Sequence, residues 1–151
     1  MKGKRTMCAK EIMRTEVVTV SPLIPVTEAA ILMRNEDVGS VVVVDEERRP
    51  IGIITDRDIV VSAVADRKNP EEMTVGELML RKPISRELVT VDEDEDVFDI
   101  LEVLARNSIR RVPVVRGEKL VGIVSVDDIV VVVATELSNL ASVLGSTSKV
   151  F

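Results

Sequence analysis

The sequence contains no histidine, tryptophan or tyrosine, and it has only two phenylalanines and one cysteine. Histidine is the most common general base and metal ligand of proteins, so its absence leaves only carboxylate or lysine–aspartate pairs for catalysis. No nucleophile stands in a recognisable pattern with a base, and we therefore expect no enzyme, no catalytic residue and no metal site. The single cysteine, Cys8, excludes an internal disulfide and a thiolate metal cluster. The scarcity of aromatic rings also excludes the stacking surface of proteins that bind single-stranded nucleic acid.

Positive charge is in the minority as well. The 151 residues include 20 lysines and arginines against 26 aspartates and glutamates, which gives a net charge of −6. Nucleic-acid binding needs a clustered positive field, so we expect no nucleic-acid partner. The sequence shows no signal peptide, and its apolar tract at 129–134 is far too short to cross a membrane. These observations predict a cytoplasmic protein with no membrane partner.

The strongest feature that is present is an internal repeat with a period of about 70 residues. Three segments of the first half return in the same order in the second half: Val18–Val20 as Val89–Val91, Val41–Val44 as Val112–Val115, and Gly52–Val60 as Gly122–Val130. Halves of this size are near the lower limit for independent folding, so we expect one compact module of two interlocked halves. We place the repeats at 8–66 and 75–137, followed by the end of a C-terminal helix and a tail at 138–151.

Hydrophobic periodicity predicts the same order of elements in each half: a short helix, a short strand, an amphipathic helix, two strands joined by a polar turn, and a second helix. Apolar residues recur at helical spacing in Val26, Ala29, Ala30 and Met33, and again in Val97, Ile100, Leu101 and Leu104. Thr27 and the acidic run 92–96 stand where helix N-termini favour a cap and negative charge.

The C-terminal helix, predicted from about Asp127 to Leu144, carries more apolar residues than a lone surface helix needs. A homodimer would bury this excess. The alternative is that the helix folds back over its own module.

Two hydroxyl–aspartate pairs are the candidate ligand site. Thr55 and Asp58 in the first half match Ser125 and Asp128 in the second, with the hydroxyl at the end of a strand and the aspartate in the first turn of a helix. A carboxylate there can accept hydrogen bonds from vicinal ribose hydroxyls, and the side-chain hydroxyl can reach a ribose or phosphate oxygen. The alternative is a helix cap with an acidic first turn. The identical spacing in both copies favours a site.

Further candidate residues would hold the base and the phosphate of a nucleotide. Aliphatic residues could line the base, with ordinary core as the alternative: Val18, Val41 and Ile53 in the first half, and Val89, Val112 and Ile123 in the second. Arg110 and Arg111 could hold a phosphate, where the first half has Gly39 and Ser40 instead. They could equally be surface arginines or partners of the acidic run. We expect two unequal clefts, with Asp128 anchoring the stronger one.

At these residues the chain resembles a tandem pair of cystathionine-β-synthase (CBS) domains, also called a Bateman module. The motifs at Val18–Pro22, Val38–Asp45 and Gly52–Val60 carry the resemblance, each with its counterpart in the second half. It implies an α/β (α+β) fold of two β-α-β-β-α repeats, related by a pseudo-twofold axis, in one compact module with two clefts.

The resemblance also implies a function. Such pairs often bind adenine nucleotides, and here the resemblance implies a regulatory module for AMP foremost, or for ADP, ATP or S-adenosylmethionine. The module would have no other cofactor, would form a homodimer and would signal to a partner protein in trans. The family's ribose-binding motif falls on Thr55/Asp58 and Ser125/Asp128, and its basic phosphate positions fall on Arg110 and Arg111. The alternative is a structural or dimerisation module that binds no ligand.

Overall fold

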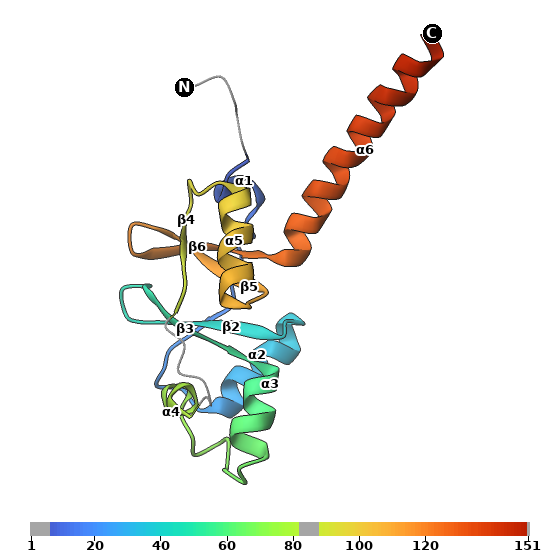
Figure 1. Cartoon of the computed structure of the whole chain (residues 1–151). Coiled ribbons are helices and arrows are strands. Elements are labelled where there is room, and N and C mark those ends of the chain that lie inside the picture. Colours follow the sequence, from blue (N-terminus) through green and yellow to red (C-terminus); the bar gives the residue numbers. More distant parts are fainter. Residues whose placement is uncertain (1–6, 82–87, 151) are drawn as a thin grey trace.

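The computed structural model describes residues 7–81 and 88–150, the last five of them by backbone alone, and it confirms the predicted order of elements in both halves (Figure 1). The first half contains α1 (Ala9–Ile12), β1 (Thr19–Val20), α2 (Val26–Glu36), β2 (Ser40–Val44), β3 (Pro50–Thr55), α3 (Asp56–Ile59) and a π-helical turn, η1 (Val60–Val64). The second half contains α4 (Val75–Leu80), β4 (Val91–Asp92), α5 (Val97–Asn107), β5 (Arg111–Arg116), β6 (Lys119–Ser125) and α6 (Val126–Val150). The predicted α/β class is confirmed.

Each half contributes one three-stranded sheet with the same topology. The orders are β1-β2-β3 and β4-β5-β6; the first two strands of each sheet run parallel and the last two antiparallel. Even the register shift recurs, at Val43/Val44 in one sheet and Val114/Val115 in the other. The middle strands are buried through consecutive residues, as their valine runs predict for strands covered on both faces.

The two halves are interlocked through their short opening helices. Ala9 of α1 belongs to the hydrophobic core of the second half, and Val75 of α4 belongs to that of the first. Two glycines permit this packing. A Cβ atom at Gly52 would meet the side chain of Met79, and one at Gly122 would meet the side chain of Met13. The helix that opens each repeat in sequence therefore completes the core of the other repeat.

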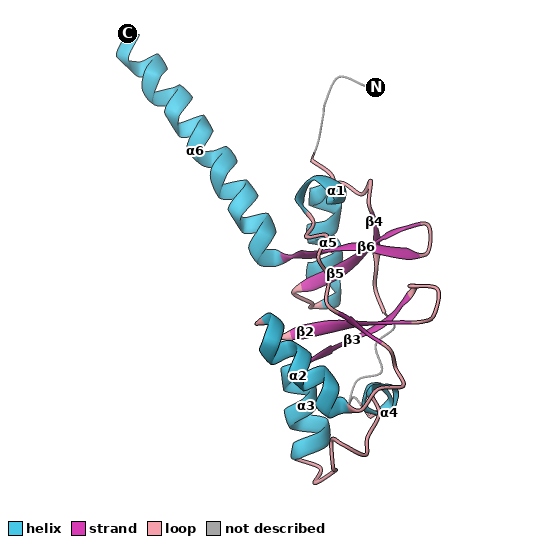
Figure 2. Ribbon diagram, turned by 180° about the vertical axis from the view of Figure 1, so that it is seen from behind, coloured by secondary structure: helices cyan, strands magenta, loops and turns pink. Residues whose placement is uncertain are grey.

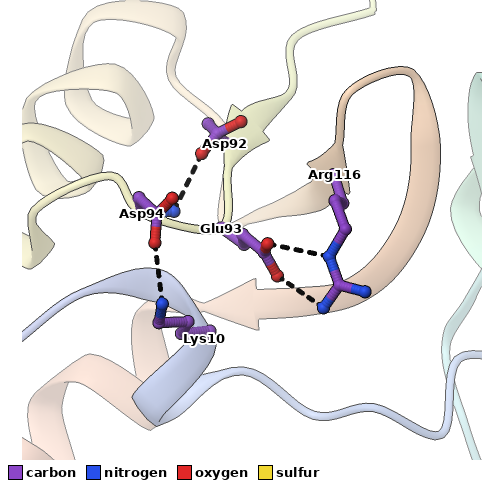
Figure 3. A network of polar contacts seen from close by, with 5 residues as sticks. All are labelled: Lys10, Asp92, Glu93, Asp94 and Arg116. Carbon is purple, nitrogen blue, oxygen red and sulfur yellow. Dashed lines mark hydrogen bonds and ion pairs between the residues drawn. The ribbon is translucent and has the colours of Figure 1, made fainter.

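Polar contacts surround α1 where it meets the second half (Figure 3). Lys10 of α1 donates to Asp94 at 2.9 Å, and beside it, within the second half, Arg116 forms a double hydrogen bond with Glu93 at 2.8 and 3.0 Å. The bond from Arg116 lowers the pKa of Glu93, and the bond to Asp94 raises the pKa of Lys10. Because the side chains of Lys10, Asp94 and Arg116 are mostly exposed, these pairs contribute little stability beyond the packing of α1.

The caps of the two amphipathic helices differ from each other. Asp96 caps α5 by accepting a hydrogen bond from the Phe98 amide at 2.7 Å, as predicted. The expected role of Thr27 is wrong, because α2 begins at Val26, after Pro25. The amides of Val26 and Thr27 donate instead to carbonyls of the segment before α4, at Met73 and Pro70. These backbone carbonyls, which belong to the segment that precedes α4, replace a side-chain cap at the N-terminus of α2.

Helix α6 leaves the module and projects away from it (Figures 1 and 2). Its first turns pack on the second core, where Ile129 is 1% exposed, but the residues from Val133 to Gly145 are all exposed. The helix does not fold back over its own module. By length and composition alone, the stretch Val126–Gly145, with a mean hydropathy of 1.5, could cross a membrane. That corrects the sequence-based view that the apolar segments are too short.

Candidate functional site

A crevice of about 1170 Å³ lies where the two halves face each other. Its walls come from the end of β3 and the start of α3 in the first half, and from the end of α5 and the start of β5 in the second. Six of the predicted site residues line it: Ile53, Thr55, Asp58, Val89, Arg110 and Arg111. A space of this size is ample for a nucleotide.

Thr55 and Asp58 form a reciprocal pair at the start of α3. The Asp58 amide donates to Thr55 Oγ1 at 3.1 Å, and the Thr55 amide donates to Asp58 Oδ2 at 2.8 Å. This capping box fixes the position of the carboxylate on the crevice wall. The cap and a ligand site are compatible roles, because each carboxylate oxygen can accept more than one hydrogen bond.

Ser125 and Asp128 form a similar pair at the start of α6, but an arginine joins it. Ser125 Oγ donates to Asp128 Oδ2 at 2.9 Å, while Arg14 Nε and Nη2 donate to Oδ1 at 3.3 and 3.1 Å. Burial raises the pKa of Asp128, but the hydrogen bonds from Arg14 and Ser125 outweigh it, so that this pKa lies below its usual value. The carboxylate is therefore held in its charged form by groups of the protein itself.

Sequence reasoning missed Arg14. Its backbone pairs with Ile123 in both directions, at 2.9 and 3.0 Å, and this pairing sets the side chain beside Asp128. Met13 packs against Gly122 as Met79 packs against Gly52, so the two methionines are equivalent in the repeat. Leu80, which follows Met79, is therefore the repeat counterpart of Arg14. Comparison of the two copies gave no signal, because leucine does not point to a carboxylate partner.

Arg110 and Arg111 meet the first hydroxyl–aspartate pair in the crevice, whereas the sequence analysis grouped them with the second. A backbone hydrogen bond that recurs in both halves supports their match to Gly39 and Ser40. The Arg110 carbonyl accepts from the first amide of α6, and the Gly39 carbonyl accepts from the first amide of α3. The Arg110 guanidinium is mostly exposed and lies 3.5 Å from Asp127. Within the described residues, the ion-pair partners found for the acidic run are Lys10 and Arg116 (Figure 3), not these two arginines.

The aliphatic candidates divide between crevice and core. Ile53 and Val89 line the crevice, while the side chains of Val41 and Val112 are fully buried in the two cores. Val18 packs against the first core, and Ile123 pairs with Arg14 away from this crevice. For Val41 and Val112 the structure therefore supports the alternative of ordinary core side chains.

Positive charge is concentrated in the crevice, although the chain as a whole is acidic. Four arginines line it against two aspartates, in a protein with a net charge of −6: Arg57, Arg106, Arg110 and Arg111 against Asp56 and Asp58. A concave surface of this sign attracts an anionic ligand. Arginine guanidinium groups are also well suited to phosphate oxygens. Among the described residues, no group of three or more histidine, cysteine, aspartate or glutamate side chains is placed to hold a metal ion.

Comparisons with known proteins agree with the repeat. The model of the CBS domain matches residues 9–64 and 75–135. An uncharacterized protein of Methanopyrus kandleri, MK0525, is 40% identical over 126 residues, which are 83% of this chain and 62% of that protein. The chain thus spans less than two thirds of this relative.

Two solved structures extend the comparison. The CBS domain pair of MJ0100, in complex with 5′-methylthioadenosine and S-adenosyl-L-methionine, is 27% identical to this chain. The match includes 87% of this chain and 99% of the MJ0100 chain, with a TM-score of 0.71. A hexameric CBS-CP12 protein from bloom-forming cyanobacteria is 35% identical, and the match includes 84% of this chain and 68% of that protein's chain, with a TM-score of 0.70.

Proposed function

Because the chain belongs to the CBS domain family and carries two such domains, we propose that it is a regulatory module that binds an adenosine nucleotide, AMP foremost, and signals its presence to a partner protein in trans. The observation that carries the proposal is the crevice between the halves, which combines a hydroxyl–aspartate pair with an excess of arginine. The related domain pair of MJ0100 binds adenosine compounds, which supports the same class of ligand here.

The proposed binding mode assigns one part of the ligand to each group of residues. Asp58 accepts hydrogen bonds from the ribose hydroxyls, and Arg110 and Arg111 hold the phosphate. Ile53 and Val89 contact the base, since both line the crevice with aliphatic side chains. The phosphate and ribose contacts then come from opposite halves of the module.

The second hydroxyl–aspartate pair is proposed as the weaker ribose site. Ser125 and Asp128 keep the required spacing, but Arg14 already donates two hydrogen bonds to the carboxylate. A ribose that binds there must displace or share Arg14, at the cost of a charge-assisted contact. The two sites are therefore unequal, as the sequence predicts, but in this proposal the stronger anchor is Asp58 instead of Asp128.

A homodimer is the proposed working form. Large apolar side chains stay exposed on α6 and on η1, including Val60 and Val64, which is more apolar surface than a small monomer usually presents. The relative from bloom-forming cyanobacteria is a hexamer, which supports self-association in this family. A twofold dimer is the most common way to bury such a surface.

Thermal unfolding in the presence of AMP, ADP, ATP, S-adenosylmethionine and adenosine tests the ligand. A ligand at a hundredfold excess over its Kd stabilises the folded protein by about 2.7 kcal/mol, which raises the melting temperature measurably. We expect the largest shift with AMP and a smaller shift with adenosine. If none of these compounds shifts the transition, the structural or dimerisation module is the better description.

A further inference from the structure

Helix α6 carries an apolar stripe whose spacing is that of a coiled coil. Steps of four and three residues alternate along it from Val126 to Leu144. We define the seam as the residues of this stripe beyond the first turn: Val130, Val133, Leu137, Leu140 and Leu144. Such alternation places side chains at the a and d positions of a heptad, which pack into holes on a facing helix.

The seam is exposed in the structure. Val130, Leu137 and Leu144 keep 58%, 61% and 62% of their surface accessible, and the helix projects away from both sheets (Figures 1 and 2). Most of the stability of a protein helix comes from the packing of its apolar face, so a projecting helix with this pattern needs a partner surface. The first turn, anchored through the buried Ile129, fixes the direction in which the seam is presented.

The polar residues of α6 indicate what kind of surface covers the seam. Thr135, Ser138, Asn139 and Ser142 lie on the opposite side of the helix, which a membrane-spanning segment would expose to lipid. From Val126 to Gly145 the helix has no lysine or arginine, the residues by which interfacial helices bind anionic lipid. The heptad spacing and the polar back both favour a second helix as the occupant.

We propose that α6 pairs with α6 of a second copy of this chain in a two-stranded coiled coil. The seam is complementary to a second copy of itself, because all its residues are valine or leucine. Whether the two helices run parallel or antiparallel, each seam residue therefore faces a valine or a leucine. The flanking positions are Ala134, Glu136, Ala141 and Val143, so that a single charge per helix borders the seam. The flanking positions therefore carry no charge pattern that would favour pairing with a helix of another protein. The two alanines let the paired helices approach closely.

This inference rests on the proposed homodimer and is independent of the proposed nucleotide. It places the dimer contact on a helix that projects from the module, whereas a disc-like dimer would use the helices against the sheets. The crevice residues do not take part in the seam.

One pair of variants tests it. Leu140→Asp puts a charge into the seam, and Ser138→Asp puts the same charge on the polar side two residues away. A buried leucine of this kind is worth about thirtyfold in affinity, and it occurs twice in the dimer, so we expect Leu140→Asp to weaken dimerisation roughly a thousandfold. Sedimentation or light scattering at micromolar concentration should give twice the chain mass of 16.6 kDa for the natural protein and Ser138→Asp, and the chain mass for Leu140→Asp.

The remaining outcomes separate the two proposals. A monomeric natural protein would overturn both the homodimer and the coiled coil. A dimer that survives Leu140→Asp would keep the homodimer but overturn the seam as its interface. Flotation of the natural protein with phosphatidylcholine–phosphatidylglycerol vesicles would also overturn the seam, since it would show that lipid covers it. The thermal transition of Leu140→Asp, compared with that of Ser138→Asp, shows that the module is folded.

Discussion

Replacing Asp58 by alanine should remove the proposed ribose anchor of the site that we propose as the stronger one. Two hydrogen bonds from ribose hydroxyls to a carboxylate contribute about 2–3 kcal/mol, so AMP affinity should fall roughly 30- to 150-fold. The same change at Asp128 is the matched control, because that residue has the same place in the second repeat and already accepts hydrogen bonds from Arg14. We expect Asp128→Ala to leave the strongest binding step unchanged.

Asp58 also belongs to the capping box of α3, and its loss therefore affects stability as well as binding. Loss of a cap costs about 1 kcal/mol, which corresponds to a melting temperature lower by roughly 2–4 °C in a chain of this size. Asp58→Asn separates the two effects, since asparagine can still accept the Thr55 amide bond but lacks the charge. Its melting temperature should stay near that of the natural protein, while its affinity for AMP falls.

Isothermal titration calorimetry with AMP and adenosine measures these effects in the folded variants. The reasoning is refuted if Asp58→Ala binds AMP like the natural protein, or if Asp128→Ala loses the strongest binding step while Asp58→Ala keeps it. The second outcome would restore the assignment that the sequence alone suggested.

Three more variants test other parts of the structure. The double replacement of Arg110 and Arg111 by alanine should weaken AMP far more than adenosine and reduce the salt dependence of AMP binding; equal weakening of both ligands in calorimetry would exclude a phosphate contact. Arg14→Ala should raise the pKa of Asp128, read by NMR titration of its carboxyl group, because the lowered pKa depends on the arginine. Since that folded-state pKa is depressed, the stability it provides is present above the ordinary value of 3.8 and is lost as the pH falls below it; the difference in stability between natural protein and Arg14→Ala should therefore shrink in acid, and a constant difference would argue against it. Gly122→Ala should destabilise the protein by about 1–3 kcal/mol in chemical denaturation, because the new methyl group meets the packed Met13 side chain and a backbone carbonyl; an unchanged midpoint would contradict the close packing of α1.

Local patterns were enough to predict most of the fold. The helical spacing of Val26, Ala29 and Met33 and the valine runs of the middle strands depend on neighbours in sequence, and the structure has them as predicted. Partner choice over long distance was not predictable in the same way. Ala9 and Val75 read as apolar helix residues whichever core they enter, so nothing in their pattern shows that α1 and α4 exchange cores.

Half of the candidate site residues predicted from the sequence line the crevice, but the prediction left out Arg57 and Arg106 there and grouped the arginines it did identify wrongly. Thr55, Asp58, Arg110 and Arg111 were all identified from the sequence, yet the repeat led us to group the arginines with the aspartate of their own half. The structure brings them to the opposite pair because the two halves face each other across the crevice. Arg14 had no signal at all, since its contact with Asp128 depends on a backbone pairing between segments that are far apart in sequence.

If the proposed nucleotide binds, the composite crevice offers a physical route from ligand binding to regulation. One wall comes from each half, and each half also holds the opening helix of the other. A nucleotide bound as we propose would connect Asp58 in the first half with Arg110 in the second, so its binding energy would act on the contact between the halves. A ligand that bound only the arrangement with both walls in place would stabilise that arrangement by RT ln(1 + [L]/Kd). The population of this arrangement would then depend on the nucleotide concentration, without any catalytic step in the module. A partner protein that contacts either half could respond to that change in population.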